Sequence, residues 1–579
     1  MNSLIKKTLL LLIFHCCLLN AARAEVIVNG VEDKVKKNVL LMLSLNKETC
    51  ESPAWKIKRL FEQADSEIDS SLRALGYYNV SLNKVLTMKN DCWQAQFAVQ
   101  LGQQVTIKTI AITIRGEAKE DEAFLSLTKS LQAKVGSPLQ HSFYESIKTR
   151  FIALAQERGY LNAQWQEKKL LVNKQANQAT IQLTLESGIR QKFGEVAIEQ
   201  TILDPEIVNK YSSIIPGAFY SSDKLVQTYD MLSKSGYFEQ IDIRPDFDRA
   251  RGRSVPIAIH LVPKDTHHYS LGLGYGTDVG LLFNAAYQNR HLNREGDSLT
   301  ANLDISFVLS TLEAEYLMPL SDDGDDPLND FFTVGVGLKN ENTDNFVSKN
   351  ATISSRLKYG FKNGWKQALF ADFSYESFTT QQQSRDSMMF IFGGNWNYST
   401  ADNMAHPTNG YRLRFDLSGS YKTPISDASF IRANMDAMWI KTLPWGDVFT
   451  GHLGLGGMTI DQFGKLPTTY RFYAGGINSV RGYDYKELGP RDAFGNVEGG
   501  KLLSVVSLEY EHPFLDEWAV AGFVDSGNAY NLDTISIKTG IGLGVRWYSA
   551  IGPLRLDFAV PLNQANSGFQ IYFAAGARL

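Results

Sequence analysis

The chain has 579 residues, of which 44% are hydrophobic and 21% charged, and its formal net charge is −4. This length exceeds that of one ordinary domain, and a small net charge without a block of Lys or Arg argues against a nucleic-acid-binding protein. Beyond the first 24 residues, no stretch reaches the roughly 18 consecutive apolar residues expected of a transmembrane helix.

Residues 1–24 have the three-part layout of a secretory signal peptide. Lys6 and Lys7 precede an apolar run over 9–19, and a small-x-small cleavage pattern ends at Ala24. A retained membrane anchor is the alternative, but the apolar run is short for a span. We therefore expect an exported mature chain that begins near Glu25.

Two cysteines, Cys50 and Cys92, remain after removal of this segment. In an exported protein two cysteines are candidates for a disulfide. Two free, buried thiols are the alternative.

Residues 25–264 contain three repeats of one pattern. A helical stretch ends at Gly76, Gly159 and Gly236, and an aromatic residue follows each glycine, with a spacing of about 80 residues. Glycine at such a position supplies a backbone that can enter the left-handed region and end a helix. The spacing predicts three small modules at residues 25–102, 103–188 and 189–264.

Each module is predicted to combine helices and strands. In the first, apolar residues recur at helical spacing from Ile57 to Leu75; in the second they are Phe143, Ile147, Phe151 and Leu154. Strands are expected at 106–114, 179–185, 193–198 and 255–262. The order within the second and third modules is therefore β-α-α-β-β.

Residues 265–579 follow a period-two pattern instead. Tyr269, Leu271, Leu273 and Tyr275 alternate with Ser270, Gly272, Gly274 and Gly276, and similar alternation continues to the end of the chain. A soluble β-sandwich also alternates. The aromatic-rich apolar face, the glycine-rich or charged opposite face and the turn-like cluster at 321–326 favour a transmembrane β-barrel.

The alternation also predicts what the barrel encloses. Arg412 and Arg414 share one face of their strand, and an arginine facing lipid at mid-depth costs about 2–4 kcal/mol. These side chains should therefore point into a polar lumen. The sheet must also close, because an open edge leaves backbone groups unsatisfied in hydrocarbon. At roughly 10 residues per strand plus connections, about 16 strands fit.

One segment of the barrel half resembles a known superfamily. Residues 472–476 (FYAGG), followed by Val480-Arg481-Gly482-Tyr483, are similar to the sixth extracellular loop of the BamA/TamA superfamily of outer-membrane assembly and secretion factors. Residues 499–500, 507–510 and 523–527 follow the downstream pattern of that superfamily. The resemblance covers the whole mature chain, and the modules are similar to periplasmic POTRA modules. Three modules rather than five favour the TamA branch.

The resemblance implies that Arg481 tethers this loop inside the lumen. A buried arginine needs carboxylate partners, and the carboxylates at positions matching the superfamily are Glu509 and Asp525. An ordinary solvated loop arginine is the alternative.

The two ends of the barrel sequence suggest a weak seam. Glycines weaken strand packing and leave register loosely specified, and the first strand is rich in them. The last strand, within 566–573, is similar to the terminal assembly signal of the superfamily, although the chain continues past it to Leu579. The predicted seam residues are Leu271, Gly272, Gly274, Tyr275, Gly568, Phe569, Ile571 and Phe573.

A seam that opens can pair with an incoming strand, and this β-augmentation requires no catalytic residue. The chain also lacks HExxH, GxSxG and P-loop motifs, so we expect no enzyme, cofactor or metal. The resemblance implies an outer-membrane location, autotransporter-type clients and a TamB-like, inner-membrane-anchored periplasmic partner bound through the POTRA modules. A two-partner secretion transporter and a passive porin are the alternatives.

Overall fold

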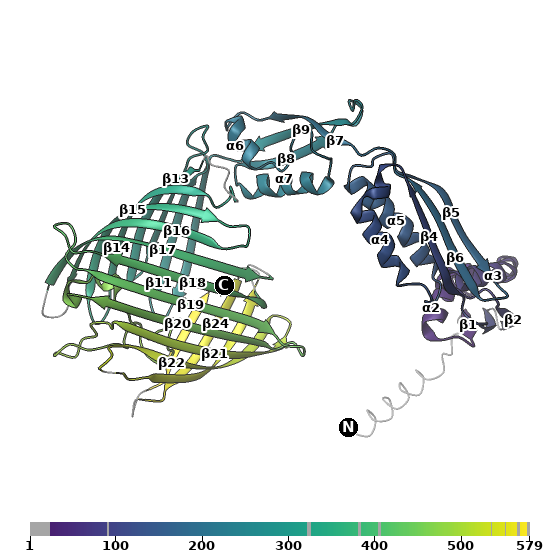
Figure 1. The fold of residues 1–579 in the computed structure, drawn as a ribbon. Coiled ribbons are helices and arrows are strands. Elements are labelled where there is room, and N and C mark those ends of the chain that lie inside the picture. Colours follow the sequence, from purple (N-terminus) through teal and green to yellow (C-terminus); the bar gives the residue numbers. More distant parts are fainter. Residues whose placement is uncertain are drawn as a thin grey trace, which may run out of the picture. The chain divides into compact units, whose positions relative to one another are not determined.

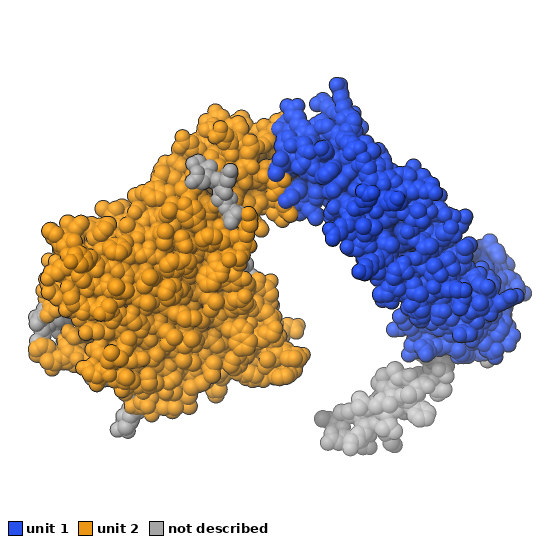
Figure 2. Space-filling model, viewed as in Figure 1, with its two compact units in different colours: residues 1–197, 214–226, 244–257 blue, residues 198–213, 227–243, 258–579 orange. Residues whose placement is uncertain are grey.

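The computed structural model describes residues 24–89, 92–320, 326–379, 384–402, 407–533, 535–549, 552–563 and 568–575. The predicted signal peptide, apart from Ala24, and most of the predicted turn at 321–326 lie outside these residues. Figure 2 shows two compact units, one of residues 1–197, 214–226 and 244–257, the other of 198–213, 227–243 and 258–579. Among the described helices, none has the length and apolarity needed to span a membrane.

The first module contains two main helices and a small sheet. Its elements are β1 (Glu25–Asn29), α2 (Asp33–Met42), η1 (Ser44–Lys47), α3 (Ala54–Ala74), β2 (Ser81–Lys89) and β3 (Cys92–Gln100). The sheet order is β1-β3-β2, with β1 parallel to β3. The predicted stripe is buried on α3 from Ile57 to Leu72, where it packs with Trp93 and Phe97 in the module's core, and Leu75, just after the helix, is partly buried.

The second module has the same order of α-helices and strands, with its 3-10 helix before both α-helices: β4 (Thr106–Arg115), η2 (Glu117–Glu120), α4 (Glu122–Gln132), α5 (His141–Glu157), β5 (Gln164–Asn173) and β6 (Gln178–Glu186). Helices α4 and α5 lie together on one face of the sheet β4-β6-β5 (Figure 1). The buried face of α5 is rotated slightly from the prediction: Tyr144 and Ala155 are buried, whereas Phe143 and Leu154 are partly buried. All four residues lie at the same apolar stripe, so periodicity alone did not show which of them would be most buried.

The third module repeats the order with β7 (Lys192–Glu199), α6 (Pro205–Lys210), α7 (Ser222–Lys234), β8 (Phe238–Pro245) and β9 (Ser254–Pro263), in a sheet ordered β7-β9-β8. The three repeat glycines, Gly76, Gly159 and Gly236, have φ values of +89°, +86° and +80°. Glycine adopts this left-handed conformation readily, and each helix ends there. The predicted β-α-α-β-β modules are confirmed.

The rest of the chain forms a 16-stranded sheet among the described residues, with sequential neighbours paired antiparallel (Figure 1). The strands are β10 (His267–Gly276), β11 (Gly280–Asn289), β12 (Ser298–Ile305), β13 (Leu309–Pro319), β14 (Phe331–Asn342), β15 (Val347–Gly360), β16 (Lys366–Thr379), β17 (Ser384–Ala401), β18 (Asn409–Ser420), β19 (Phe430–Thr442), β20 (Val448–Ile460), β21 (Leu502–Leu515), β22 (Trp518–Tyr530), β23 (Lys538–Ser549), β24 (Gly552–Pro561) and β25 (Gln570–Ala575).

The pleat sorts side chains between the two faces of this sheet. On β14, Val334, Val336 and Leu338 are exposed outward, whereas Thr333 on the other face is buried. Apolar side chains therefore face lipid and polar side chains face the lumen, as a barrel in a bilayer requires. The predicted sixteen-stranded antiparallel barrel is confirmed.

The barrel is nearly closed but its seam is not sealed. Among the described residues, β10 pairs only with β11 and β25 only with β24. The two end strands nevertheless lie beside each other: the ring centroids of Tyr275 on β10 and Phe573 on β25 are 6.3 Å apart. The seam therefore holds two strand edges in contact without a backbone ladder.

Candidate functional site

A long connection, residues 461–501 between β20 and β21, folds into the barrel; we call it loop 6. Its residues Leu466, Phe472, Val480, Tyr483 and Leu488 are buried. It reaches across the lumen to β16, where the hydroxyl of Thr468 donates to Glu376 at 2.6 Å, and to β14, where Lys486 pairs with Glu341. Loops of this length inside a compact fold are usually functional.

Arg481 lies at the centre of a buried charge cluster on the barrel wall. Its Nε and Nη2 donate to the two oxygens of Asp525 at 2.7 and 3.0 Å, which is a bidentate pair. Its Nη1 donates to Glu509 at 2.8 Å and to Asp557 at 2.9 Å. The guanidinium also lies 3.4 Å from the ring centroid of Phe523. These contacts join loop 6 to β21, β22 and β24.

A second arginine completes the cluster. Arg546 on β23 donates to Glu509 at 2.7 Å and also pairs with Asp557. The five charged residues are at most 6% exposed. Two cations face three carboxylates, so each buried carboxylate has at least one guanidinium partner, which is the condition under which such charges are tolerated.

Glycines let loop 6 lie directly on the barrel wall. A Cβ on Gly540 of β23 would be 1.8 Å from the carbonyl oxygen of Arg481, and one on Gly482 would be 3.1 Å from the backbone of Val560 on β24. The φ of Gly482 is +98°, a conformation that other residues rarely adopt. The flanking Val480 and Tyr483 are fully buried.

The predicted seam residues lie on both sides of the open seam. Leu271, Gly272, Gly274 and Tyr275 belong to β10, and Ile571 and Phe573 belong to β25, whereas Gly568 and Phe569 precede β25. The main-chain N–H of Phe573 donates to the hydroxyl of Thr277 at 3.3 Å.

Between loop 6 and the barrel wall is a polar cavity of about 480 Å³. It is lined in part by Arg412 and Arg414, so both side chains lie on the lumen side. Arg412 donates to Asp436 at 3.1 Å and Arg414 donates to Asn397 at 3.1 Å. The lumen is thus polar and partly filled.

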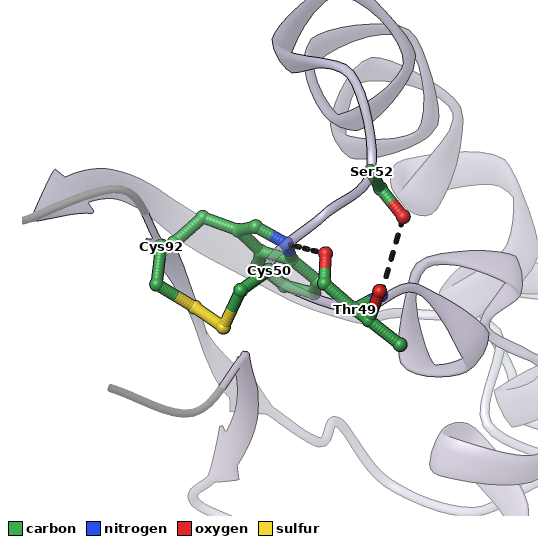
Figure 3. The surroundings of a disulfide bond; sticks show 5 residues. Thr49, Cys50, Ser52 and Cys92 are labelled. Atoms are coloured by element: carbon green, nitrogen blue, oxygen red, sulfur yellow. Dashed lines mark hydrogen bonds between the residues drawn. A yellow bond between two sulfur atoms is a disulfide. The ribbon is translucent and has the colours of Figure 1, made fainter. Parts of the chain in front are cut away.

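Cys50 and Cys92 form a disulfide in the first module, with Cα atoms 4.5 Å apart (Figure 3). Cys92 begins β3, and Cys50 lies between η1 and α3. The bond therefore attaches the turn before the main helix to the central strand of the sheet.

The second module contains an ion pair of its own, between the buried Asp121 and the partly exposed Arg158. Burial raises the pKa of Asp121, but hydrogen bonds from Arg158 at 2.9 Å and from the N–H of Ala123 at 3.1 Å outweigh it, so the pKa lies below its usual value. Burial and the nearby Asp121 carboxylate together raise the pKa of Tyr160 to about 12. Asp121 also caps α4.

Sequence reasoning named Glu509 and Asp525 as partners of Arg481, and both contact it. It did not name Arg546 or Asp557. The alternation near the chain end places Arg555 and Asp557 together on the polar face of their strand. That pattern was the sequence signal by which Asp557 could have been found. Asp278 and Tyr572 also contact loop 6. Tyr572 lies in the segment recognised as the terminal assembly signal, but its contact with loop 6 was not predicted, and Asp278 was not named.

Comparison with protein families matches the barrel half of the chain and its first module. The Omp85 superfamily domain matches residues 266–579, more than half of the sequence. The chain belongs to the Omp85 superfamily. Residues 25–101 match the POTRA domain described as TamA domain 1, so the first module of this Omp85 chain is a TamA-type POTRA domain.

Curated relatives are distant. The chain is 25% identical over 425 residues to the outer membrane protein assembly factor BamA of Nitratidesulfovibrio vulgaris, covering 69% of this chain and 52% of that protein. It is 23% identical over 435 residues to BamA of Neisseria meningitidis serogroup B, covering 62% and 52%. The chain spans about half the length of these relatives.

A solved structure shares the fold. BamA from Haemophilus ducreyi lacking POTRA domains 1–3 superposes with a TM-score of 0.68 at 18% identity, covering 82% of this chain and 99% of that one. The Omp85 chain described here is thus an outer-membrane β-barrel protein with periplasmic POTRA modules.

Proposed function

We propose that this protein is an outer-membrane assembly and translocation factor that helps insert and secrete autotransporter-type barrel proteins. The single observation that carries the proposal is the unsealed seam between β10 and β25. Membership in the Omp85 superfamily and similarity to BamA assembly factors support it.

The seam offers what an incoming strand needs. An antiparallel edge strand directs alternate backbone N–H and C=O groups outward, and unsatisfied groups in hydrocarbon cost several kcal/mol each. Outward-facing Leu271 and Leu273 are 77% and 80% exposed, so the edge of β10 lies at the lipid surface. Pairing with a client strand satisfies these groups, and the folding of the client in the membrane supplies the free energy.

The POTRA modules would supply docking edges in the periplasm. Strand β2 ends the sheet of the first module and β5 ends that of the second. Val85, Met88 and Leu171 on these strands are exposed apolar side chains. A client strand or a TamB-like, inner-membrane-anchored partner could add to such an edge by β-augmentation.

Deletion of the gene, followed by a quantitative census of outer-membrane proteins, tests the proposed client class. We expect autotransporters to fall while abundant porins stay at their normal level, with recovery on complementation. Autotransporter levels unchanged in the deletion strain, including under autotransporter overproduction that saturates other insertion routes, would refute the assignment.

Single-channel conductance separates the proposal from a passive channel. Loop 6 and the Arg481 cluster lie buried inside the lumen and partly fill it, so we expect a mostly closed pore with brief openings. A steady, open conductance would favour a porin, and dependence of one exported protein alone on this chain would favour a two-partner secretion transporter.

A further inference from the structure

Loop 6 contacts the first hairpin of the barrel at its tip. Asp278 lies in the turn between β10 and β11, and its Oδ2 accepts a hydrogen bond of 2.7 Å from the main-chain N–H of Ile477. A Cβ on Gly476 would lie 2.6 Å from the same carboxylate oxygen. The loop backbone and the turn are therefore packed against each other.

Loop 6 also contacts the last strand, on the opposite side of the seam. The hydroxyl of Tyr572 accepts from the N–H of Gly482 at 2.9 Å and donates to the carbonyl of Tyr483 at 2.8 Å. Gln570 donates to Asp484 of the loop at 3.1 Å. Tyr572 is 3% exposed, so both of its hydrogen bonds are shielded from water.

The two sides of the seam are held unequally. Among the described residues, three hydrogen bonds join β25 to loop 6, and one joins the first hairpin to it. Loop 6 is further fixed to β21, β22 and β24 through Arg481. Besides its contacts with β14 and β16 across the lumen, loop 6 is therefore anchored to the C-terminal strands beside the seam.

The other contacts at the tip of the first hairpin are longer or apolar: the hydroxyl of Thr277 accepts from the N–H of Phe573 at 3.3 Å, and a Cβ on Gly280 would lie 2.8 Å from the ring of Phe307. A Cβ on Gly272 would lie 3.7 Å from its nearest neighbour, Asn284, and a Cβ on Gly274 would lie 3.9 Å from Leu282. Both neighbours belong to the paired strand β11. Pairing of β11 with β12 begins at Phe283, so within the described part of the chain residues 280–282 form no backbone ladder with β12.

We propose that loop 6 brackets the seam asymmetrically: Tyr572 keeps the last strand on the loop, and Asp278 is the latch of the first hairpin. The seam opens when the contact of Asp278 with Ile477 breaks, and the β10–β11 hairpin then moves while β25 stays in place. This inference rests on the seam-opening function proposed above and names the moving strand and the residues that hold each side.

Spin-label distances in the full-length protein, in lipid nanodiscs without client, test which side moves. Nitroxides are placed on outward-facing positions: Leu455 on β20 as reference, paired with Leu281 on β11 or with Ile571 on β25. Asp278→Ala removes a charged acceptor, and this should raise the population of altered Leu281–Leu455 distances by roughly ten-fold or more. The Ile571–Leu455 distances should not change.

Graded and reciprocal variants sharpen the test. Asp278→Asn keeps an oxygen acceptor without the charge, so its effect should lie between those of the wild type and Asp278→Ala. If Asp278→Ala does not fold, the intermediate effect of Asp278→Asn still tests the latch. Tyr572→Phe keeps the ring but removes both hydrogen bonds, and should shift the Ile571 pair instead. The control is Asp492→Ala, a loop-6 carboxylate bonded to Phe494 and Asn496.

Unchanged Leu281–Leu455 distances in the Asp278 variants, or equal shifts on both sides of the seam, would overturn the proposed latch. Insertion of an unfolded autotransporter β-domain, measured in parallel with the same variants, separates this result from the broader proposal. If the hairpin is released but insertion does not change, the latch stands and the seam-based function fails.

Discussion

Replacement of Arg481 by alanine tests the charge cluster that fixes loop 6. The wild-type side chain donates four hydrogen bonds of 3.0 Å or less to three buried carboxylates. After truncation, Arg546 still reaches Glu509 and Asp557. Asp525 loses its guanidinium partner and keeps hydrogen bonds from the hydroxyl of Ser507 and from the main-chain N–H of residue 481. One buried carboxylate is then left without a cation, and breaking such a pair costs about 3–5 kcal/mol.

The measurement is urea unfolding of the protein in lipid vesicles, followed by tryptophan fluorescence and by protease cleavage within loop 6. Arg481→Ala should lower the free energy of unfolding by about 3–5 kcal/mol and expose the loop to protease. Arg481→Lys keeps the charge but not the planar fork, so its loss should be smaller.

A double-mutant cycle isolates the pair. Asp525→Asn removes the charge that Arg481→Ala leaves uncompensated, so the double variant should lose less stability than the sum of the two single variants. If Arg481→Ala changed stability by less than about 0.5 kcal/mol, the size expected of a neutral surface substitution, or if the losses simply added, the reasoning would be wrong.

Three further predictions follow from local geometry. Gly540→Ala should displace loop 6 and expose it to protease, because its Cβ would meet the loop backbone at 1.8 Å, whereas Gly522→Ala, with nothing nearer than 3.7 Å, should not. Reduction of Cys50–Cys92, which are 42 residues apart, should lower protection of α3 from hydrogen exchange by up to roughly 4 kcal/mol. Asp121 has a depressed pKa, so its stabilisation is present above about pH 4 and is lost as pH falls through the folded-state value.

Each has its own control. Proteolysis of the two glycine variants is compared in the same vesicles, and equal cleavage would contradict the close approach. A double serine variant of the two cysteines should not respond to reductant. In Asp121→Asn, the protection of α4 from hydrogen exchange should depend less on acid pH than in the wild type. Acid sensitivity identical to the wild type would show that another group titrates there.

The fold followed closely from local pattern. The stripe on α3 reports the buried face of that helix, and the alternation from Tyr269 to Tyr275 reports the lipid-facing side of the first barrel strand, because in each case one face must be apolar. Gly76, Gly159 and Gly236 marked helix ends because few other residues adopt a positive φ at such positions. Each of these patterns is local, because the residues that form it lie in the same helix, strand or turn that it predicts.

The site followed only in part, because its contacts join distant residues. Arg481 and Glu509 were recognisable from a motif and its family pattern. Arg546 is a neighbour of Glu509 only because the strand pairing places β23 between β22 and β24. The hydrogen bonds at Asp278 and Tyr572 depend on the path of loop 6 through the lumen, and no periodicity encodes that path.

The most direct test of the account is to lock the seam reversibly. Tyr275→Cys and Phe573→Cys, at positions whose wild-type rings are in contact, are joined by a short thiol cross-linker containing a cleavable bond in vesicle-reconstituted protein. Insertion of an unfolded autotransporter β-domain is then measured before and after cleavage. The account predicts that insertion stops in the locked protein and returns on cleavage; undiminished insertion by the locked protein would contradict it.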